Sequence, residues 1–181
     1  MVAVDTDKSL LAAYGALLEY PGHDLQSGCA ALQESLLELA PEAASWLEGF
    51  MALSGRLTRA ELEEQYTRAF DLAPQAVPYL SVYLFGPEGT QRGPFMAGLK
   101  GAYAEAGFDG GSELSDHVSL VLRFLPLASD EDYQALRAWC LLPPIRQMAR
   151  DLERAANPYG HLMHSLAAFL ANSADGDTDH V

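Results

Sequence analysis

The chain has 181 residues, of which 49% are apolar and 20% are charged. This composition excludes a disordered, collagen-like or low-complexity chain and predicts a globular fold with one hydrophobic core. Its 25 acidic and 11 basic residues give a net charge of −14, which repels nucleic-acid phosphates and anionic lipid head groups but permits a cationic partner. We therefore expect neither nucleic-acid binding nor direct membrane insertion.

Helix-forming residues dominate the sequence. Leucine occurs 29 times and alanine 28 times, against 7 valines and a single isoleucine, and this balance disfavours strands. Helical spacing of apolar residues, interrupted by proline and glycine, defines the main segments. These are 10–18, 24–39, 41–54, 58–70, 95–106, 118–125, 129–142, 145–155 and 159–169. The sequence thus predicts an all-α, single-domain helical bundle of about nine helices over residues 1–171, followed by an acidic flexible tail over residues 172–181.

Several helix ends carry recognisable signals. Thr58 and Glu61 have the spacing of a capping box, in which each side chain accepts a hydrogen bond from the other residue's backbone N–H. Pro143 and Pro144 are expected to break the helix before them, because proline lacks a backbone N–H. Glu113 and Asp116 are expected in the first turn of a helix, where the helix dipole favours negative charge.

The two cysteines, Cys29 and Cys140, lie far apart in apolar helical contexts. They form no C-x-x-C motif, so neither a disulfide framework nor a thiolate metal site is expected. The N-terminus lacks the basic start and apolar core of a signal peptide, and no stretch reaches the ~18 apolar residues of a membrane span. These features predict a cytoplasmic protein.

Common enzyme signatures are missing from the chain. It has no phosphate-binding loop, no dinucleotide-binding glycine turn and no G-x-S-x-G nucleophile elbow. His161 and His164 would be neighbours on a helix, and with His117, Glu113 and Asp116 they define an alternative function, a helical-bundle metalloenzyme. Against it, the chain lacks the Glu-x-x-His repeat of bundle metal sites. A ligand-sensing regulator is a further alternative, but it would need a basic DNA-reading helix, and no predicted helix offers one.

Aromatic residues occupy a segment that otherwise has the composition of a loop. Residues 71–93 contain several prolines and glycines around a short apolar run, so we expect a short helix within 77–85 between loops. Tyr79, Tyr83 and Phe85 belong to this run, and loops that keep aromatic residues often bind partners. The sequence leaves open whether these rings bind a partner or fill the core.

Glu113, Asp116 and His117 form a second unusual group, because all three lie within five residues. A helix N-cap explains one acidic residue, but it does not explain three titratable side chains in so short a stretch. Capping combined with chance remains the alternative explanation.

The order and spacing of these residues resemble a known family. The chain is similar to the nitrate reductase delta subunit (NarJ) branch of the TorD/DmsD redox-enzyme maturation chaperones, most closely from Leu62 to Leu125. The family commonly has proline where this chain has Ser115, which leaves the turn there less rigid. The matching elements are Tyr66, Phe70-Asp71-Leu72, Tyr79-Leu80, Tyr83-Leu84-Phe85-Gly86, Arg92-Gly93, Met96, Leu99, Tyr103, Gly107-Phe108, Glu113-Leu114-Ser115-Asp116-His117, Val121-Leu122 and Phe124-Leu125.

This resemblance implies an all-helical cytoplasmic chaperone rather than an enzyme. It would bind the N-terminal segment of the apo catalytic subunit of a molybdenum oxidoreductase of the nitrate reductase type, either a twin-arginine signal or its remnant. It would hold that subunit for molybdenum cofactor insertion, with the insertion machinery as a further partner. No motif argues for a bound nucleotide or pterin, so no cofactor of its own is expected, and relatives form monomers and dimers.

The resemblance and the side-chain chemistry together predict one partner-peptide site and no catalytic or metal site. Aromatic rings would receive apolar side chains, while Glu113 and Asp116 would attract arginine. The pKa of His117, ordinarily near 6.5, is expected to shift toward the charged form beside Asp116 and so to tune release. The predicted site comprises Tyr79, Tyr83, Phe85, Arg92, Gly93, Glu113, Asp116 and His117.

Overall fold

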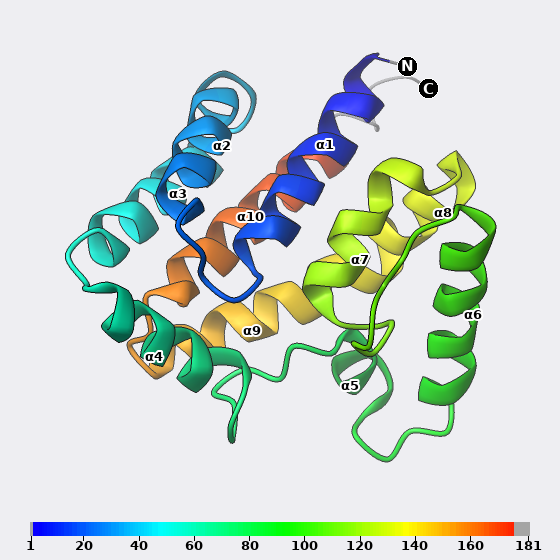
Figure 1. The fold of residues 1–181 in the computed structure, drawn as a ribbon. Helices are drawn as coiled ribbons and strands as arrows, with labels where there is room; N and C mark the ends of the chain where they lie inside the picture. Colours follow the sequence, from blue (N-terminus) through cyan, green and yellow to red (C-terminus); the bar gives the residue numbers. More distant parts are fainter. Residues whose placement is uncertain (1, 176–181) are drawn as a thin grey trace. The chain divides into compact units, whose positions relative to one another are not determined.

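The computed structural model describes residues 2–175. They divide into two compact units, and neither unit is one continuous stretch of sequence. The first unit contains residues 2–19 and 78–144, and the second contains residues 20–77 and 145–175. Every regular element of the described residues is helical (Figure 1), which confirms the predicted all-α class.

The first unit is built on α1 (Val2–Leu17) and α7 (Val118–Phe124), which pack against each other. Ser119 Oγ donates a hydrogen bond to the carbonyl oxygen of Gly15 at 2.9 Å. A Cβ on Gly15 would lie only 2.8 Å from the backbone oxygen of Ser119, so the two helices meet where α1 has no side chain. The other elements of this unit are α5 (Leu80–Phe85), α6 (Arg92–Glu105), the 3-10 turn η1 (Leu125–Leu127), α8 (Asp130–Ala135) and the π-helical turn η2 (Leu136–Leu141).

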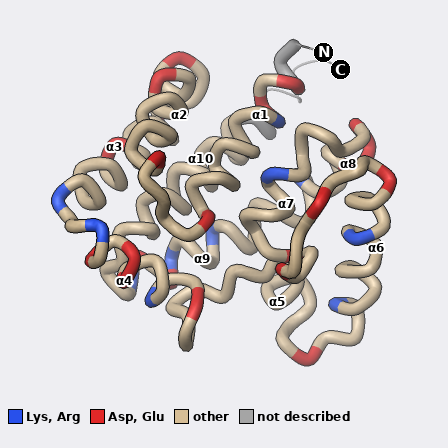
Figure 2. The backbone as a smooth tube through the Cα atoms, viewed as in Figure 1, with Lys and Arg blue, Asp and Glu red and all other residues tan. Residues whose placement is uncertain are grey.

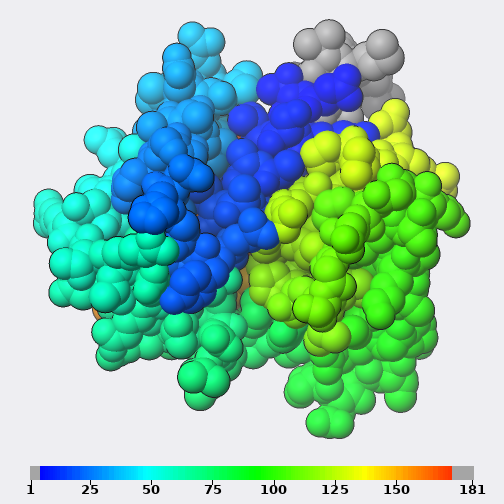
Figure 3. Space-filling model, in the orientation of Figure 1, coloured from blue at the N-terminus to red at the C-terminus, as the bar shows by residue number. Residues whose placement is uncertain are grey.

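The second unit is built on α3 (Pro41–Ser54) and α10 (Tyr159–Asp175). Ser165 Oγ of α10 donates to the carbonyl oxygen of Ala43 at 2.7 Å. The turn after α4 protrudes from the surface (Figure 3), and Leu72 in that turn is exposed. The remaining helices are α2 (Leu25–Leu39), α4 (Arg59–Phe70) and α9 (Leu142–Arg154), of which α9 begins in the first unit.

The capping box at the start of α4 is confirmed. The Thr58 N–H donates to Glu61 Oε2 at 2.7 Å, and the Glu61 N–H donates to Thr58 Oγ1 at 3.3 Å. Figure 2 shows acidic residues on helices and loops of both units, as the net charge of −14 requires.

The expectation that Pro143 and Pro144 break a helix is wrong. The chain stays helical from Asp130 to Arg154, through α8, η2 and α9. The π-helical turn η2 loosens the helix just before the two prolines, where a proline ring would otherwise clash with the preceding turn. This turn also carries Trp139, which is 76% exposed.

Helix α10 continues to Asp175, past residue 172, where the sequence predicts an acidic tail. Residues 176–181 of that tail lie outside the described residues. The predicted boundary between a domain over residues 1–171 and a tail therefore stays a prediction.

Candidate functional site

The loop before α7 pairs with the segment that enters α5. The Leu80 N–H donates to the carbonyl oxygen of Asp116 at 3.0 Å, and the Val118 N–H donates to that of Pro78 at 2.8 Å. These bonds form an isolated bridge between Tyr79 and His117. We name Tyr79, Glu113, Asp116 and His117 the motif corner, because this pairing brings together residues more than thirty positions apart.

The predicted position of the acidic residues within a helix is wrong. Helix α7 begins at Val118, so Glu113 and Asp116 lie in the loop that precedes it. An extended backbone at His117 pairs this loop with Tyr79, and an extended residue cannot at the same time belong to a helical turn.

Asp116 is fully buried and supports the first turn of α5. Its Oδ2 accepts hydrogen bonds from the backbone N–H of Ser81 at 3.2 Å and from the Ser81 hydroxyl at 2.5 Å. Ser81 Oγ in turn accepts a hydrogen bond from Nε of Arg92 at 2.9 Å, and Nη1 of Arg92 donates to the carbonyl oxygen of Pro87 at 2.8 Å. Arg92 thus reaches the buried carboxylate through a serine hydroxyl, and the network connects α5, α6 and the loop before α7.

Glu113 forms the exposed edge of the motif corner. Its Oε1 accepts hydrogen bonds from the Leu114 N–H at 2.8 Å and from the Tyr79 hydroxyl at 3.3 Å. The Tyr79 ring meets the His117 ring edge to face, with centroids 5.6 Å apart. Glu113 therefore presents a carboxylate to solvent beside two half-buried rings.

The remaining predicted site residues lie along α5 and at the start of α6. Tyr83 is half-buried, whereas Phe85 is 39% exposed and packs edge to face on Phe95 at 5.7 Å. Gly93 is exposed, and a Cβ added to it would meet nothing within 4 Å. The aromatic residues of this segment are therefore not sealed in the core, while nothing in the local packing requires glycine at position 93.

Two serines that sequence reasoning missed hold the motif corner in place. Besides Ser81, the buried Ser115 donates from its hydroxyl to the carbonyl oxygen of Met96 at 2.8 Å. The Tyr103 hydroxyl donates to the carbonyl oxygen of Ser115 at 2.7 Å. These bonds to α6 fix the turn at Ser115. A serine inside an apolar run was the only sequence signal for Ser81.

The expected upward shift of the His117 pKa is wrong in direction. Burial lowers the pKa of His117, because it penalises the charged imidazolium. The carboxylates of Glu113, Asp116 and Glu19 oppose this effect without reversing it. His117 is therefore neutral at neutral pH.

The lowered pKa of His117 makes stability depend on pH. When the pH falls below about 6.5, the ordinary pKa of histidine, His117 takes up a proton in the unfolded chain but resists it in the folded protein. The stability that neutral His117 contributes is therefore lost as the pH falls through its folded-state pKa. We expect His117→Gln to flatten the decline in the free energy of unfolding between pH 7.5 and 5. His161, whose pKa burial also lowers, should account for part of the remaining slope. Urea unfolding at several pH values measures this, and an unchanged slope in both His117→Gln and the double variant with His161→Gln would contradict it.

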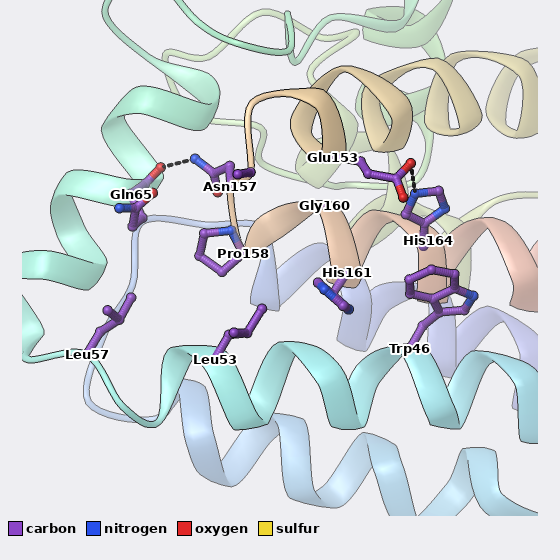
Figure 4. Close-up of a pocket in the computed structure, with 11 residues that line it drawn as sticks. Trp46, Leu53, Leu57, Gln65, Glu153, Asn157, Pro158, Gly160, His161 and His164 are labelled. Carbon is purple, nitrogen blue, oxygen red and sulfur yellow. Dashed lines mark hydrogen bonds and ion pairs between the residues drawn. The ribbon is translucent and has the colours of Figure 1, made fainter.

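The structure offers no support for the metalloenzyme alternative. Within residues 2–175, no group of three or more His, Cys, Asp or Glu side chains is arranged to hold a metal ion. His161 and His164 instead flank Trp46, with ring centroids 5.4 and 4.5 Å from its ring (Figure 4). Nε2 of His164 lies 3.3 Å from Oε2 of Glu153.

The class of this all-helical chain, with its Glu-Leu-Ser-Asp-His loop, follows from its similarity to known proteins. The family model of the nitrate reductase delta subunit matches residues 23–174, and the chain belongs to that family. This confirms the resemblance inferred from the sequence. The match includes the whole motif corner.

A curated relative is similar over nearly its full length. The probable nitrate reductase molybdenum cofactor assembly chaperone NarJ of Bacillus subtilis (strain 168) is 27% identical over 170 residues, which cover 92% of this chain and 91% of the relative. Among the described residues, no helix combines the length and the apolar character needed to cross a membrane.

Proposed function

We propose that the chain is an assembly chaperone for the molybdenum-containing catalytic subunit of a nitrate reductase-type enzyme. It binds the N-terminal segment of the apo-subunit and holds the subunit for cofactor insertion. Family membership and the chaperone function for which the Bacillus subtilis relative is named support the chaperone class. One geometric observation supports the binding site, namely the exposed Glu113 carboxylate beside the half-buried rings of Tyr79 and His117.

Each part of the motif corner has its own task in this proposal. Glu113 pairs with an arginine of the client segment, because a carboxylate and a guanidinium form strong charge-assisted hydrogen bonds. The exposed Phe85 and the half-buried Tyr83 of α5 contact apolar residues of the segment. Asp116 is buried, so its task is to hold Tyr79 and the α5 turn rather than to meet the client.

The expected affinity suits a chaperone that must release its client. Burial of several hundred Å² of apolar peptide surface contributes about 25 cal/mol per Å². Ordering a flexible segment offsets much of this gain. The balance favours a complex of micromolar or somewhat tighter affinity that cofactor insertion can dissolve.

We also expect the chain to act in the cytoplasm and to catalyse no step of its own. Its contribution is to keep the client's N-terminal segment out of other contacts while the cofactor insertion machinery acts on the apo-subunit. Binding is expected with the chaperone as a monomer or a dimer.

Calorimetric titration with a peptide of the client's N-terminal segment tests the proposal. We expect binding, and we expect Glu113→Gln to weaken it on the order of tenfold, since a charge-assisted bond contributes about 1.5–3 kcal/mol. Glu88→Gln, which removes an exposed carboxylate from the loop between α5 and α6, is the matched control and should leave the affinity unchanged. Absence of binding, or equal weakening by both variants, would overturn the proposed site.

A further inference from the structure

The second unit contains a cavity of about 400 Å³. It lies between α3 with the loop that follows it, the middle of α4, and the end of α9 with the start of α10 (Figure 4). Leu53 and Leu57 line one side, and Pro158 lines the opposite side. This volume falls within the range of ~300–1,000 Å³ typical of ligand sites.

One wall of the cavity is a fixed aromatic stack. The rings of Trp46 and His164 lie nearly parallel, with an interplanar angle of 20°. The His161 ring also contacts the Trp46 ring, at a tilt of 59°, and packs against α3 at Gly49, where a Cβ would lie 2.5 Å from its Nδ1. The pairing of His164 with Glu153 holds the stack from α9. Trp46 is therefore positioned by its neighbours before any ligand arrives.

The α9–α10 turn that closes the cavity is held in a strained conformation. Ala156 has a positive φ of 52°, a left-handed conformation that is unfavourable for a residue with a Cβ. The buried Asn157 keeps the turn in place, since its Nδ2 donates to the carbonyl oxygen of Gln65 at 3.0 Å and to Oε1 of Gln75 at 2.9 Å. Its Oδ1 accepts from the Tyr159 N–H at 3.0 Å. These bonds fix the turn, and a left-handed residue of this kind is a common way for a helix to end.

The charges around the cavity select one class of ligand. None of its lining residues is lysine or arginine, so no permanently cationic side chain is present to pair with a phosphorylated or other anionic ligand. Its carboxylate belongs to Glu153, whose side chain is 62% exposed. Leu53, at 39% exposure, leaves apolar surface open to an incoming group. The lining therefore favours an apolar side chain followed by a cationic residue.

We propose that this cavity anchors an apolar side chain of a cationic amphipathic peptide. The inference rests on the proposed function, and it identifies the peptide with the client's N-terminal segment. The apolar side chain packs on Leu53, Leu57 and the edge of Trp46. An adjacent arginine or lysine of the peptide pairs with Glu153.

A single-tryptophan protein reports directly on this cavity. The chain has two tryptophans, and Trp139→Phe removes the exposed one. The tryptophan emission then comes from Trp46. Titration of this variant with the client N-terminal peptide should shift the Trp46 emission at the same concentrations that produce heat in calorimetry. A peptide with its arginines replaced by glutamate should give neither signal.

Affinity measurements with matched leucine variants complete the test. We expect Leu53→Ser to weaken peptide binding at least tenfold, and Leu37→Ser, an exposed leucine of α2, to leave it unchanged. Wild-type affinity in Leu53→Ser together with an unshifted Trp46 emission would overturn the cavity inference and leave the proposed function intact. Absence of peptide binding to the wild-type protein would overturn both.

Discussion

Replacement of Gly15 by alanine is expected to destabilise the protein by about 3 kcal/mol. The added Cβ would lie 2.8 Å from the backbone oxygen of Ser119 and 2.8 Å from Cγ of Arg123. The arginine side chain can turn aside, but the backbone of α7 cannot. Helices α1 and α7 must therefore separate and lose close packing in the core of the first unit. Urea unfolding followed by circular dichroism measures the loss in the free energy of unfolding.

Gly98→Ala in α6 is the matched control for this substitution. A Cβ on Gly98 meets nothing within 4 Å, and alanine stabilises a helix interior by about 0.5–1 kcal/mol relative to glycine. The two glycine variants should therefore shift stability in opposite directions. Similar small shifts in both would contradict the close approach of α1 and α7 at Gly15.

Removal of the buried carboxylate in Asp116→Ala is expected to destabilise the first unit by about 3 kcal/mol. The backbone N–H and the hydroxyl of Ser81 would both lose their acceptor inside the protein, and Arg92 would lose the charge it faces through Ser81. Asp116→Asn keeps one acceptor oxygen in place, so its cost should be about 1 kcal/mol. Urea unfolding of the two variants measures the difference.

Peptide affinity shows whether the network of Asp116, Ser81 and Arg92 positions the binding site or only stabilises the fold. Ser81 is buried and cannot touch a client. We nevertheless expect Ser81→Ala to weaken peptide binding, because it removes the hydroxyl that links Asp116 to Arg92 and so loosens the first turn of α5 beside Tyr79. Gly15→Ala, whose effect lies in the contact of α1 with α7, should leave the affinity of the folded fraction unchanged. Equal peptide affinity in Ser81→Ala and the wild-type protein would contradict the positioning task of Asp116 and Ser81.

Much of the helical framework follows from local sequence. The capping box of Thr58 and Glu61, the proline that opens α3 and the short helix α5 all lie where their residues predict them. Such signals act within one or two helical turns, so they can be read without knowledge of the fold. The helical spacing of apolar residues likewise predicts the buried face of α1.

The prediction fails where tertiary contacts outweigh local preference. Pro143 and Pro144 are accommodated because the π-helical turn η2 precedes them, and no sequence rule announces such a turn. The same turn carries Trp139 to the surface, although its spacing groups it with buried apolar residues. A change of helical register cannot be read from a pattern that assumes a constant period.

The candidate site was only partly accessible to sequence reasoning. Tyr79, Glu113, Asp116 and His117 are predicted from the sequence to form one site, and the structure brings them together. Their role in partner binding stays a prediction. Asp116 is buried whereas Glu113 is exposed, so the two carboxylates have different tasks. Burial depends on how the whole first unit packs. Burial also reverses the expected shift of the His117 pKa, since desolvation outweighs the neighbouring carboxylates.

Capture of the apo catalytic subunit tests the central claim most directly. The tagged chaperone is mixed with the full-length apo-subunit or with a version that lacks only its N-terminal segment, and the complexes are quantified by size-exclusion chromatography. We expect a complex with the full-length subunit and loss of that complex when the segment is absent. Undiminished capture of the truncated subunit would contradict the account, because the recognised surface would then lie elsewhere on the client.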